Sequence, residues 1–233
     1  MSTLQVRNLT AGYGKLQVVH NLDLTIEEKD KIIAFTGPNG AGKSTIFKTI
    51  MGLTNVFSGS IRLDGEEISG LGPYEIVKRG ITLVPQEHNV FSGLSVRRNL
   101  EVSCINQNKT NELLDYVYEL FPVLQSRQEQ NAGSLSGGEK RMLAIGCGLM
   151  TGVEFLLVDE PSIGLQPSIT TELRDKLASL DLKIGWIVLE DYVEVFELAD
   201  KCYVISNGQI TFQGKPADAI REKEAEKAIF GSV

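Results

Sequence analysis

Cysteine is scarce in this chain of 233 residues, which has only Cys104, Cys147 and Cys202 and no C-x-x-C pair. An odd number of widely spaced thiols indicates neither a disulfide framework nor a zinc site, and it favours a reducing compartment such as the cytoplasm. Apolar runs of about 18 residues are also lacking, and no charged N-terminal segment precedes an apolar one. We therefore expect neither a membrane span nor a signal peptide, so any spans that the protein works with must belong to other chains.

Positive charge is in deficit too. The chain has 23 Lys and Arg against 30 Asp and Glu, a formal net charge of −7. Because nucleic-acid binders displace counterions with broad basic surfaces, we expect no nucleic-acid partner, and only a local basic site stays open. Internal repeats and low-complexity linkers are absent as well, and a hydrophobic content of 42% suffices for a substantial core. The length fits one large domain or a core with an inserted lobe.

A glycine-rich stretch is the main feature that the chain does have. It matches G-x-x-x-x-G-K-[ST] and reads Gly37-Pro38-Asn39-Gly40-Ala41-Gly42-Lys43-Ser44-Thr45. The apolar run 31–36 predicts a buried strand before it, and a helical pattern follows it. Glycines let the backbone turn with positive φ and approach an anion closely, so that N–H groups and the helix N-terminus point at phosphates. We expect Lys43 to reach the β- and γ-phosphates and the Ser44 hydroxyl to hold Mg²⁺; the alternative is a glycine-rich turn that binds nothing.

Two further strands end in polar residues. The apolar run 155–158 predicts a central parallel strand and is followed by Asp159 and Glu160. Asp159 can join the Mg²⁺ shell, and Glu160 can accept a proton from a water that attacks the γ-phosphate; the alternative is a strand that ends in solvated acids. The run 81–84 is another short strand, and Gln86 follows it. Gln86 is placed either to reach the metal or the attacking water, or to be a solvated loop residue.

Residues 87–150 read as a helical lobe inserted into an α/β core. An apolar stripe at helical spacing runs through 113–121. The lobe ends in Leu135-Ser136-Gly137-Gly138-Glu139, in which Ser136 and Glu139 have capping-box spacing. Gly137 and Gly138 leave the first N–H groups clear, so this helix tip is either a second anion site or a simple cap.

The remaining stretches complete an α/β prediction. Strand patterns at 4–9, 17–26 and 60–63 indicate antiparallel strands, with a hairpin turn at 64–65. Tyr13 ends the first of these strands, either as a base-stacking ring or as half-buried packing. An amphipathic helix over 169–180, a buried strand over 186–189 and a hairpin turn at 207–208 follow. Residues 1–86 and 151–233 are expected to form one core with an N-terminal antiparallel β subdomain.

Taken together, these stretches resemble the ATP-binding-cassette (ABC) ATPases over nearly the whole chain. The matching positions, in the family's order, are Tyr13 for the adenine-stacking aromatic, Gly37 to Thr45 for the Walker A loop, Gln86 for the Q-loop, Leu135 to Glu139 for the LSGGQ-like signature, Asp159 and Glu160 for the Walker B pair, and Ser162 to Gln166 for the D-loop. The resemblance implies a P-loop NTPase (RecA-like) core, with ATP and Mg²⁺ as cofactors.

The resemblance also implies partners. In this family two cassettes, identical or different, face head to tail, and ATP is sandwiched between the Walker A loop of one and the signature of the other, here Ser136, Gly137 and Gly138. ATP binding closes the pair, hydrolysis reopens it, and polytopic permease subunits are driven between conformations. The implied location is the cytoplasmic face of the cell membrane. By resemblance the permease docks on the segment 86–98, where Phe91, Leu94 and Val96 form either an apolar contact patch or ordinary lobe packing.

A closer likeness is to the cassettes of branched-chain amino-acid and urea-type importers. It is carried by Leu120-Phe121-Pro122-Val123-Leu124, by Ala144-Ile145-Gly146 and by Leu165-Gln166-Pro167-Ser168-Ile169. It implies an importer of amino acids or similar small polar solutes that works with a solute-binding protein.

Three positions depart from the family pattern. Asp191 stands where most cassettes have a switch histidine, and the two histidines, His20 and His88, lie elsewhere. An anion that faces a phosphate is repulsive in a dry site, so Asp191 either turns away or orients water or metal; the importer group often lacks this histidine. Cys147 replaces a usual arginine and Gln166 the D-loop aspartate, which affects turnover and signalling between subunits more than ATP binding.

Two other functions remain open at this stage. One is a soluble ABC ATPase with a role such as iron–sulfur assembly; chromosome-type members carry a long coiled coil and ribosome-type members usually two cassettes, and neither is present. The other is a small-molecule phosphotransferase, which leaves the signature loop and Glu160 without a role.

Overall fold

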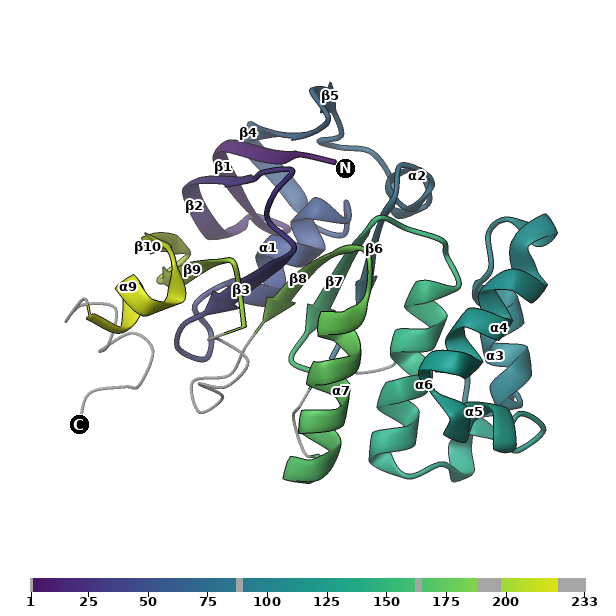
Figure 1. The fold of residues 1–233 in the computed structure, drawn as a ribbon. Coiled ribbons are helices and arrows are strands. Elements are labelled where there is room, and N and C mark those ends of the chain that lie inside the picture. Colours follow the sequence, from purple (N-terminus) through teal and green to yellow (C-terminus); the bar gives the residue numbers. More distant parts are fainter. Residues whose placement is uncertain (1, 87–89, 162–164, 188–197, 222–233) are drawn as a thin grey trace.

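The fold is built from two β-sheets and a group of helices (Figure 1). The computed structural model describes residues 2–86, 90–161, 165–187 and 198–221. Figure 1 shows the antiparallel sheet at the upper left, the mainly parallel sheet in the middle and the helices α3 to α6 at the right. This is the predicted α/β organisation, with an antiparallel β part at the N-terminus and an inserted helical part.

The antiparallel sheet has the strand order β2-β1-β4-β5. Its strands are β1 (Leu4–Tyr13), β2 (Leu16–Ile26), β4 (Asn55–Leu63) and β5 (Glu66–Glu67). The turn predicted at 64–65 joins β4 to β5, with Leu63 paired to Glu66. Alternate residues of β2 (Leu22, Leu24 and Ile26) are buried, as expected when one face of a sheet covers a core.

The second sheet has the order β10-β9-β3-β8-β7-β6. Its strands are β3 (Ile32–Thr36), β6 (Ile81–Val84), β7 (Phe155–Asp159), β8 (Lys183–Ile187), β9 (Lys201–Ser206) and β10 (Gln209–Gly214). All neighbours run parallel except β9 and β10, which the predicted turn at 207–208 joins as a hairpin. The carboxyl ends of β3, β6 and β7 therefore meet at one edge, where α/β sheets bind ligands.

One face of the parallel sheet packs against the antiparallel sheet and α1 (Lys43–Ile50). The ring of Phe35 in β3 lies edge-to-face on Phe47 of α1, with 4.9 Å between centroids, and stacks on Tyr203 of β9 at 5.3 Å. The Tyr203 hydroxyl donates to the Thr25 carbonyl of β2 at 2.7 Å. This tyrosine therefore ties the two sheets together. The short helix α2 (Pro73–Lys78) buries Ile76 in the same core.

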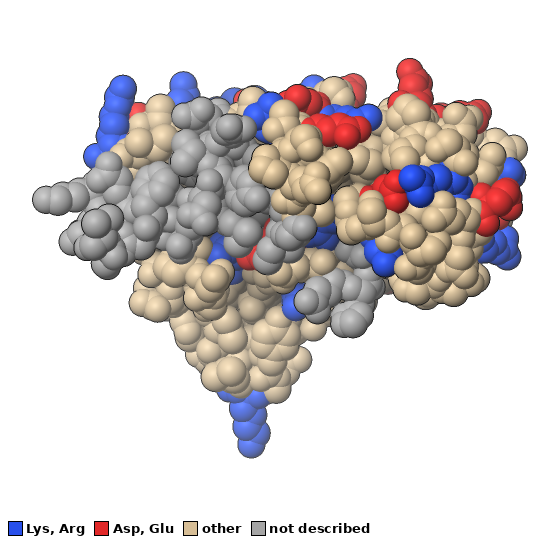
Figure 2. Space-filling model, turned by 90° about the horizontal axis from the view of Figure 1, so that it is seen from below, with Lys and Arg blue, Asp and Glu red and all other residues tan. Residues whose placement is uncertain are grey.

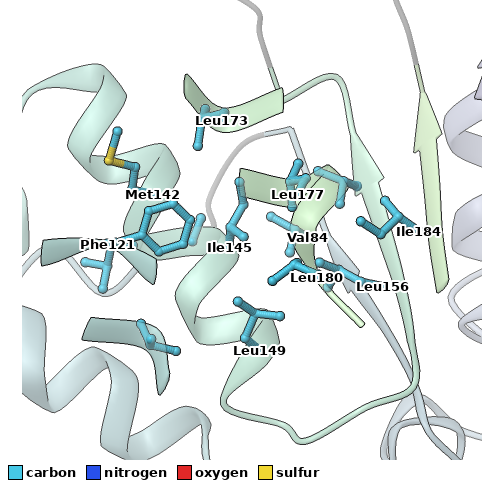
Figure 3. Packing of buried hydrophobic residues seen from close by; sticks show 14 of the residues in the cluster. Val84, Phe121, Met142, Ile145, Leu149, Leu156, Leu173, Leu177, Leu180 and Ile184 are labelled. Atoms are coloured by element: carbon cyan, nitrogen blue, oxygen red, sulfur yellow. The ribbon is translucent and has the colours of Figure 1, made fainter. Parts of the chain in front are cut away.

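The opposite face of the sheet packs against α6 (Gly137–Leu149) and α7 (Pro167–Ser179). Figure 3 shows Ile145 and Leu149 of α6, with Leu173 and Leu177 of α7, meeting Val84 and Leu156 of the sheet. Since β7 sends Leu156 to this face and Leu157 to the other, the strand is apolar on both sides, as predicted for a central parallel strand. The helix α9 (Pro216–Arg221) adds the buried Ala219 to this core.

The helical lobe contains α3 (Val96–Ser103), the 3₁₀ turn η1 (Gln107–Lys109), α4 (Thr110–Leu120), α5 (Pro122–Ser126) and the 3₁₀ turn η2 (Ala132–Ser134). The predicted apolar stripe is there: α4 buries Leu114 and Val117, and Phe121 follows the helix. These side chains extend the apolar cluster beneath α6. None of the helices in the described ranges has the length and apolarity needed to cross a bilayer.

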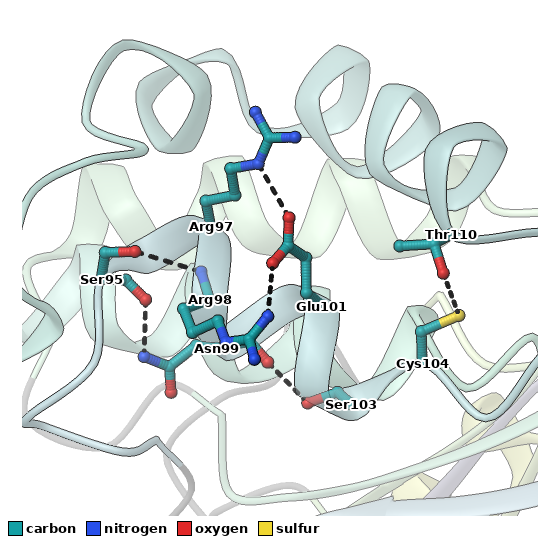
Figure 4. Close-up of polar contacts among 8 residues, drawn as sticks. All are labelled: Ser95, Arg97, Arg98, Asn99, Glu101, Ser103, Cys104 and Thr110. Carbon is teal, nitrogen blue, oxygen red and sulfur yellow. Dashed lines mark hydrogen bonds and ion pairs between the residues drawn. The ribbon is translucent and has the colours of Figure 1, made fainter. Parts of the chain in front are cut away.

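Asn99 on α3 holds the loop that precedes this helix. It is fully buried; its side-chain oxygen accepts from the Phe91 N–H at 2.7 Å, and its amide donates to the Ser95 carbonyl at 2.9 Å. Figure 4 shows the Ser95 and Asn99 contacts next to the Arg97 and Arg98 bonds to Glu101.

Only part of the predicted docking patch is at the surface. Phe91 is 64% exposed and Leu94 is half-buried, whereas Val96 is fully buried in the lobe. Of the two readings, packing therefore holds for Val96. Figure 2 shows Lys or Arg atoms beside Asp or Glu atoms over the helical lobe, at the right of that view.

Candidate functional site

The glycine-rich loop lies between β3 and α1. Gly37 begins it at a φ of 140°, and a Cβ on this residue would lie 1.9 Å from the Ile205 carbonyl oxygen of β9, so no other residue fits. Gly42, at a φ of 103°, caps α1 without a side-chain bond. The first turn of α1 therefore has no side-chain cap, and its positive dipole end faces the loop, which suits an anion there.

The ammonium of Lys43 lies over this loop. Its Nζ donates to the carbonyl oxygens of Gly37 at 2.6 Å and Pro38 at 3.0 Å, and the residue is 5% exposed. A cation is thus held at the mouth of the loop, beside the N-terminus of α1. This arrangement gives the loop both the hydrogen-bond donors and the charge that bind phosphate.

Ser44 and Asp159 meet at the carboxyl edge of the sheet. Ser44 Oγ donates to Asp159 Oδ1 at 3.1 Å. Burial raises the pKa of Asp159, while the Ser44 hydrogen bond and the nearby Lys48 oppose the rise. One hydroxyl and one carboxylate on neighbouring elements suit Mg²⁺, which keeps several waters and takes phosphate oxygens as further ligands.

Glu160 follows directly and is 9% exposed. Burial raises its pKa, the negative charge of Asp159 adds to the rise, and Lys43 opposes it. Its backbone has a φ of 45°, in the left-handed region that non-glycine residues rarely adopt. A carboxylate with a raised pKa near a phosphate cradle has the chemistry of a general base.

Gln86 and Tyr13 border the cradle from two other elements. Gln86 is half-buried, two residues after β6, and Val84 of β6 pairs with Val158 of β7, so Gln86 lies at the same edge as Asp159. Tyr13 ends β1 and is 43% exposed, which leaves a ring face open. Its hairpin borders the cradle because the Val18 carbonyl oxygen of β2 would lie 3.5 Å from a Cβ on Gly42.

The second predicted anion site is at the tip of α6. Ser136 Oγ accepts from the Glu139 N–H at 3.3 Å, and Glu139 Oε2 accepts from the Ser136 N–H at 2.9 Å, so the predicted capping box is confirmed. Ser136 and Gly137 are exposed. In the described part of the chain, no hydrogen bond joins this tip to the loop 37–45. The cradle helix α1 and the signature helix α6 instead cover opposite faces of the sheet.

Several sequence predictions concern other positions. Asp191, His88 and the first three D-loop residues, 162–164, lie outside the described residues. Gln166 is exposed and caps α7 without a side-chain bond. Cys147 is half-buried on α6, and burial raises the pKa of its thiol to about 11.

Arg141 belongs to this edge of the sheet although the sequence analysis gave it no role. It lies on α6, is 6% exposed and hydrogen-bonds the backbone at the ends of β6 and β7. The sequence does contain a signal for it, because Arg141 directly precedes the apolar run 142–145 of a helix. A cation at such a buried position must have hydrogen-bond acceptors nearby.

Comparisons with known proteins show the family of the chain. The family described as ABC transporter matches residues 19–163, more than half of the chain. A protein of Archaeoglobus fulgidus named as the probable branched-chain amino acid transport ATP-binding protein LivF is 35% identical, over 99% of both chains. The high-affinity branched-chain amino acid transport ATP-binding protein BraG of Pseudomonas aeruginosa is 38% identical, over 94% of this chain and 95% of its own.

A solved structure shows the same fold. The crystal structure of a nucleotide-free ATP-binding cassette from an ABC transporter has a TM-score of 0.85 to this chain and covers 100% of both, at 22% identity. The family match, the near-full-length relatives and the geometry of the cradle lead to one conclusion: the chain belongs to the ABC transporter family as an ATP-binding cassette, an ATPase that supplies the energy of a membrane transporter.

Proposed function

We propose that the carboxyl edge of the parallel sheet binds ATP with Mg²⁺ and hydrolyses it. The phosphates bind the cradle of Gly37 to Thr45, the adenine stacks on Tyr13, and Ser44, Gln86 and Asp159 hold the metal. The observation that carries the proposal is the 3.1 Å contact between Ser44 and Asp159, which joins the cradle to the acidic strand end. Two oxygens so close at a phosphate site are the donors that Mg²⁺ prefers.

Each residue of the site has a distinct task in the reaction. The Lys43 ammonium exchanges the carbonyls of Gly37 and Pro38 for the β- and γ-phosphate oxygens, so it trades neutral acceptors for charged ones. The Glu160 carboxylate accepts the proton of the attacking water, and its raised pKa makes it a better acceptor than a solvated glutamate. Mg²⁺ supplies charge neutralisation between the phosphates.

We further propose that the active species is a pair of cassettes. At this tip Ser136 and Gly137 are exposed, and the N–H groups of Gly137 and Gly138 make no hydrogen bond within the described part of the chain, yet the tip is carried by the helix that covers the other face of the sheet. One chain therefore offers two anion sites, the cradle and the helix tip, and each binds the phosphates of a different ATP molecule. In this proposal residues 1–86 and 151–233 act as the nucleotide-binding core, and residues 87–150 act as the lobe that presents the signature to a second, identical or different cassette.

The proposed cargo is an amino acid or a similar small polar solute, taken into the cell. Support comes from the LivF and BraG relatives, whose names include branched-chain amino acid transport. The partners are then polytopic permease subunits and a solute-binding protein, with the cassette on the cytoplasmic face of the membrane. Residues of the ATP site do not touch cargo, so the proposed cargo depends on the similarity to these relatives rather than on the chemistry of the site.

The test is to purify the native protein from detergent-solubilised membranes and identify the chains that accompany it. We expect polytopic permease chains, and ATPase activity that rises when a branched-chain amino acid and its binding protein are added to the reconstituted complex. A protein that leaves the membranes without any polytopic partner would contradict the transport role. A complex that responds to another class of solute would contradict only the cargo.

A further inference from the structure

Arg141 carries a positive charge into the apolar interior beneath the sheet. It is 6% exposed, and the next four residues of α6, 142–145, are all buried in the apolar cluster. Burial lowers the pKa of its guanidinium, and the charges of Asp159 and Glu160 oppose that change. A buried cation of this kind persists only when its N–H groups are satisfied.

The guanidinium is satisfied by five backbone carbonyls. Nε donates to Pro161 at 3.0 Å, Nη1 donates to Pro85 at 2.9 Å and to Gln86 at 3.2 Å, and Nη2 donates to Asp159 at 2.9 Å and to Glu160. These acceptors come from two segments, the loop after β6 and the end of β7 with the loop that follows it. One side chain of the lobe therefore binds both polar strand ends of the ATP site.

The Arg141 hydrogen bonds go to backbone carbonyls and do not occupy the carboxylates of Asp159 and Glu160. The Asp159 carboxylate accepts from Ser44, and the Glu160 carboxylate stays available as a base. What the guanidinium holds is the main chain on either side of Glu160, whose φ is 45°. For a residue with a side chain this left-handed conformation costs about 1–2 kcal/mol, so it needs such external contacts to persist.

The same arginine belongs to the helix that carries the signature. Ser136 caps α6 and Arg141 follows five positions later, so the anion-binding tip and the guanidinium lie on one rigid helix, about 7–8 Å apart along its axis. A movement of the tip relative to the sheet must therefore pull on the carbonyls of Gln86 and Glu160. Helix and strand ends move together as long as the five hydrogen bonds remain.

We propose that Arg141 is a positioning residue for ATP hydrolysis. By holding the carbonyls on either side of Glu160 and in the Gln86 loop, it places the base for attack and makes that placement follow the signature helix. The inference rests on the proposed role of Glu160 as the base. Arg141 itself touches neither ATP nor the attacking water in this scheme.

The first experiment compares Arg141→Gln with a matched arginine. Misplacing a base by about 1 Å costs roughly 100-fold in rate, so we expect kcat to fall by about ten- to 100-fold. The KM for ATP should change by less than about threefold, because Arg141 has no bond to the cradle. The control is Arg62→Gln, at an exposed arginine of β4 whose partner is Glu67 on the neighbouring strand β5. Its kcat and KM should stay at the parent values.

A double variant separates positioning from a merely structural role. If Arg141 acts mainly through Glu160, then Arg141→Gln added to Glu160→Gln should cause a much smaller loss in single-turnover hydrolysis than Arg141→Gln causes alone. A full additional loss in the double variant overturns the proposal, and so does an unchanged kcat in Arg141→Gln. The measurements are made at a temperature at which circular dichroism shows every variant folded.

Arg141→Lys keeps the inference testable if the glutamine variant does not fold. Its ammonium can donate three of the five bonds, so we expect a kcat between those of the parent and Arg141→Gln, with KM again unchanged. A parent-like kcat in Arg141→Lys, or a loss confined to KM, overturns the proposal. Failure of the base assignment has a different signature: Glu160→Gln alone would then hydrolyse ATP at the parent rate.

Discussion

The hydroxyl of Ser44 donates a hydrogen bond to the carboxylate of Asp159, although 115 positions separate the two residues in the chain. Ser44 lies on α1, the helix that follows β3, and Asp159 ends β7; in the sheet β8 lies between β3 and β7. Gly185 of β8 lets α1 cross that strand, because a Cβ there would lie 3.3 Å from the Phe47 ring and 2.7 Å from Leu157. A bare backbone between the two strands thus allows the cradle helix to reach the acidic strand end.

This contact predicts the effect of Ser44→Ala. The variant removes one of the proposed metal ligands while the cradle backbone stays in place. We expect kcat at saturating Mg²⁺ to fall by on the order of 100-fold, which is about 2.7 kcal/mol of activation free energy. Steady-state phosphate release across a Mg²⁺ titration is the measurement. Ser58→Ala, at an exposed serine of β4, is the control, and an unchanged Mg²⁺ dependence in Ser44→Ala would contradict the assignment.

Lys43→Ala tests the charge at the mouth of the cradle. A charge-assisted hydrogen bond contributes about 1.5–3 kcal/mol, so we expect the affinity for ATP to fall by about ten- to 150-fold. Calorimetric titration with ATP measures the change directly. Lys78→Ala removes an exposed lysine of α2 and should bind ATP as the parent does. Equal affinity in Lys43→Ala and the parent is incompatible with a phosphate contact.

Glu160→Gln should keep ATP binding and lose hydrolysis. The amide cannot accept a proton, so ATP stays intact between two cassettes and a closed dimer accumulates. Size-exclusion chromatography with ATP and an assay of released phosphate give the two readouts. Glu172→Gln, at an exposed acid of α7, serves as the control. Phosphate release at the parent rate would show that another group is the base.

Tyr203→Phe tests the hydroxyl that joins the two sheets. The ring and its stacking on Phe35 remain, while the bonds to the Thr25 carbonyl and N–H are lost. Lys201 still donates to the same carbonyl, so the free energy of unfolding should fall by only about 1 kcal/mol. Urea unfolding at neutral pH measures it. Tyr74→Phe, an exposed tyrosine, should be neutral; a Tyr203→Phe variant as stable as the parent contradicts the role of the bond.

The difference in stability between the parent and Tyr203→Phe should depend on pH. Burial raises the pKa of Tyr203 above its ordinary value of 10.0. Above that pH the unfolded chain releases the phenolic proton while the folded chain keeps it, so the parent loses stability as pH rises. Phenylalanine has no such proton, and the stability gap between parent and Tyr203→Phe should therefore narrow above pH 10. Urea unfolding at pH 9 and pH 10.5 checks this, and a constant gap would contradict it.

Local features were predictable because their causes lie within a few residues. The Ser136 and Glu139 capping box depends on two side chains three positions apart, and both hydrogen bonds are present. The hairpin at 64–65 depends on a turn pair between two strand patterns. The exposure of Phe91 and Val96 was not predictable, because its cause lies in distant parts of the chain. Both residues are apolar, and only tertiary packing decides that Val96 is buried while Phe91 is exposed.

By itself the sequence determined the glycine-rich loop before α1, the capped helix tip and the family resemblance, because backbone turns, caps and motif spacing arise from short-range chemistry. Tertiary structure alone decided that Ser44 meets Asp159, that Tyr203 bridges two sheets and that Arg141 binds five carbonyls. These contacts depend on strand order and on the crossing of helices over the sheet, which bring distant segments together to bury both faces. The spacing of residues along the chain carries no record of that arrangement.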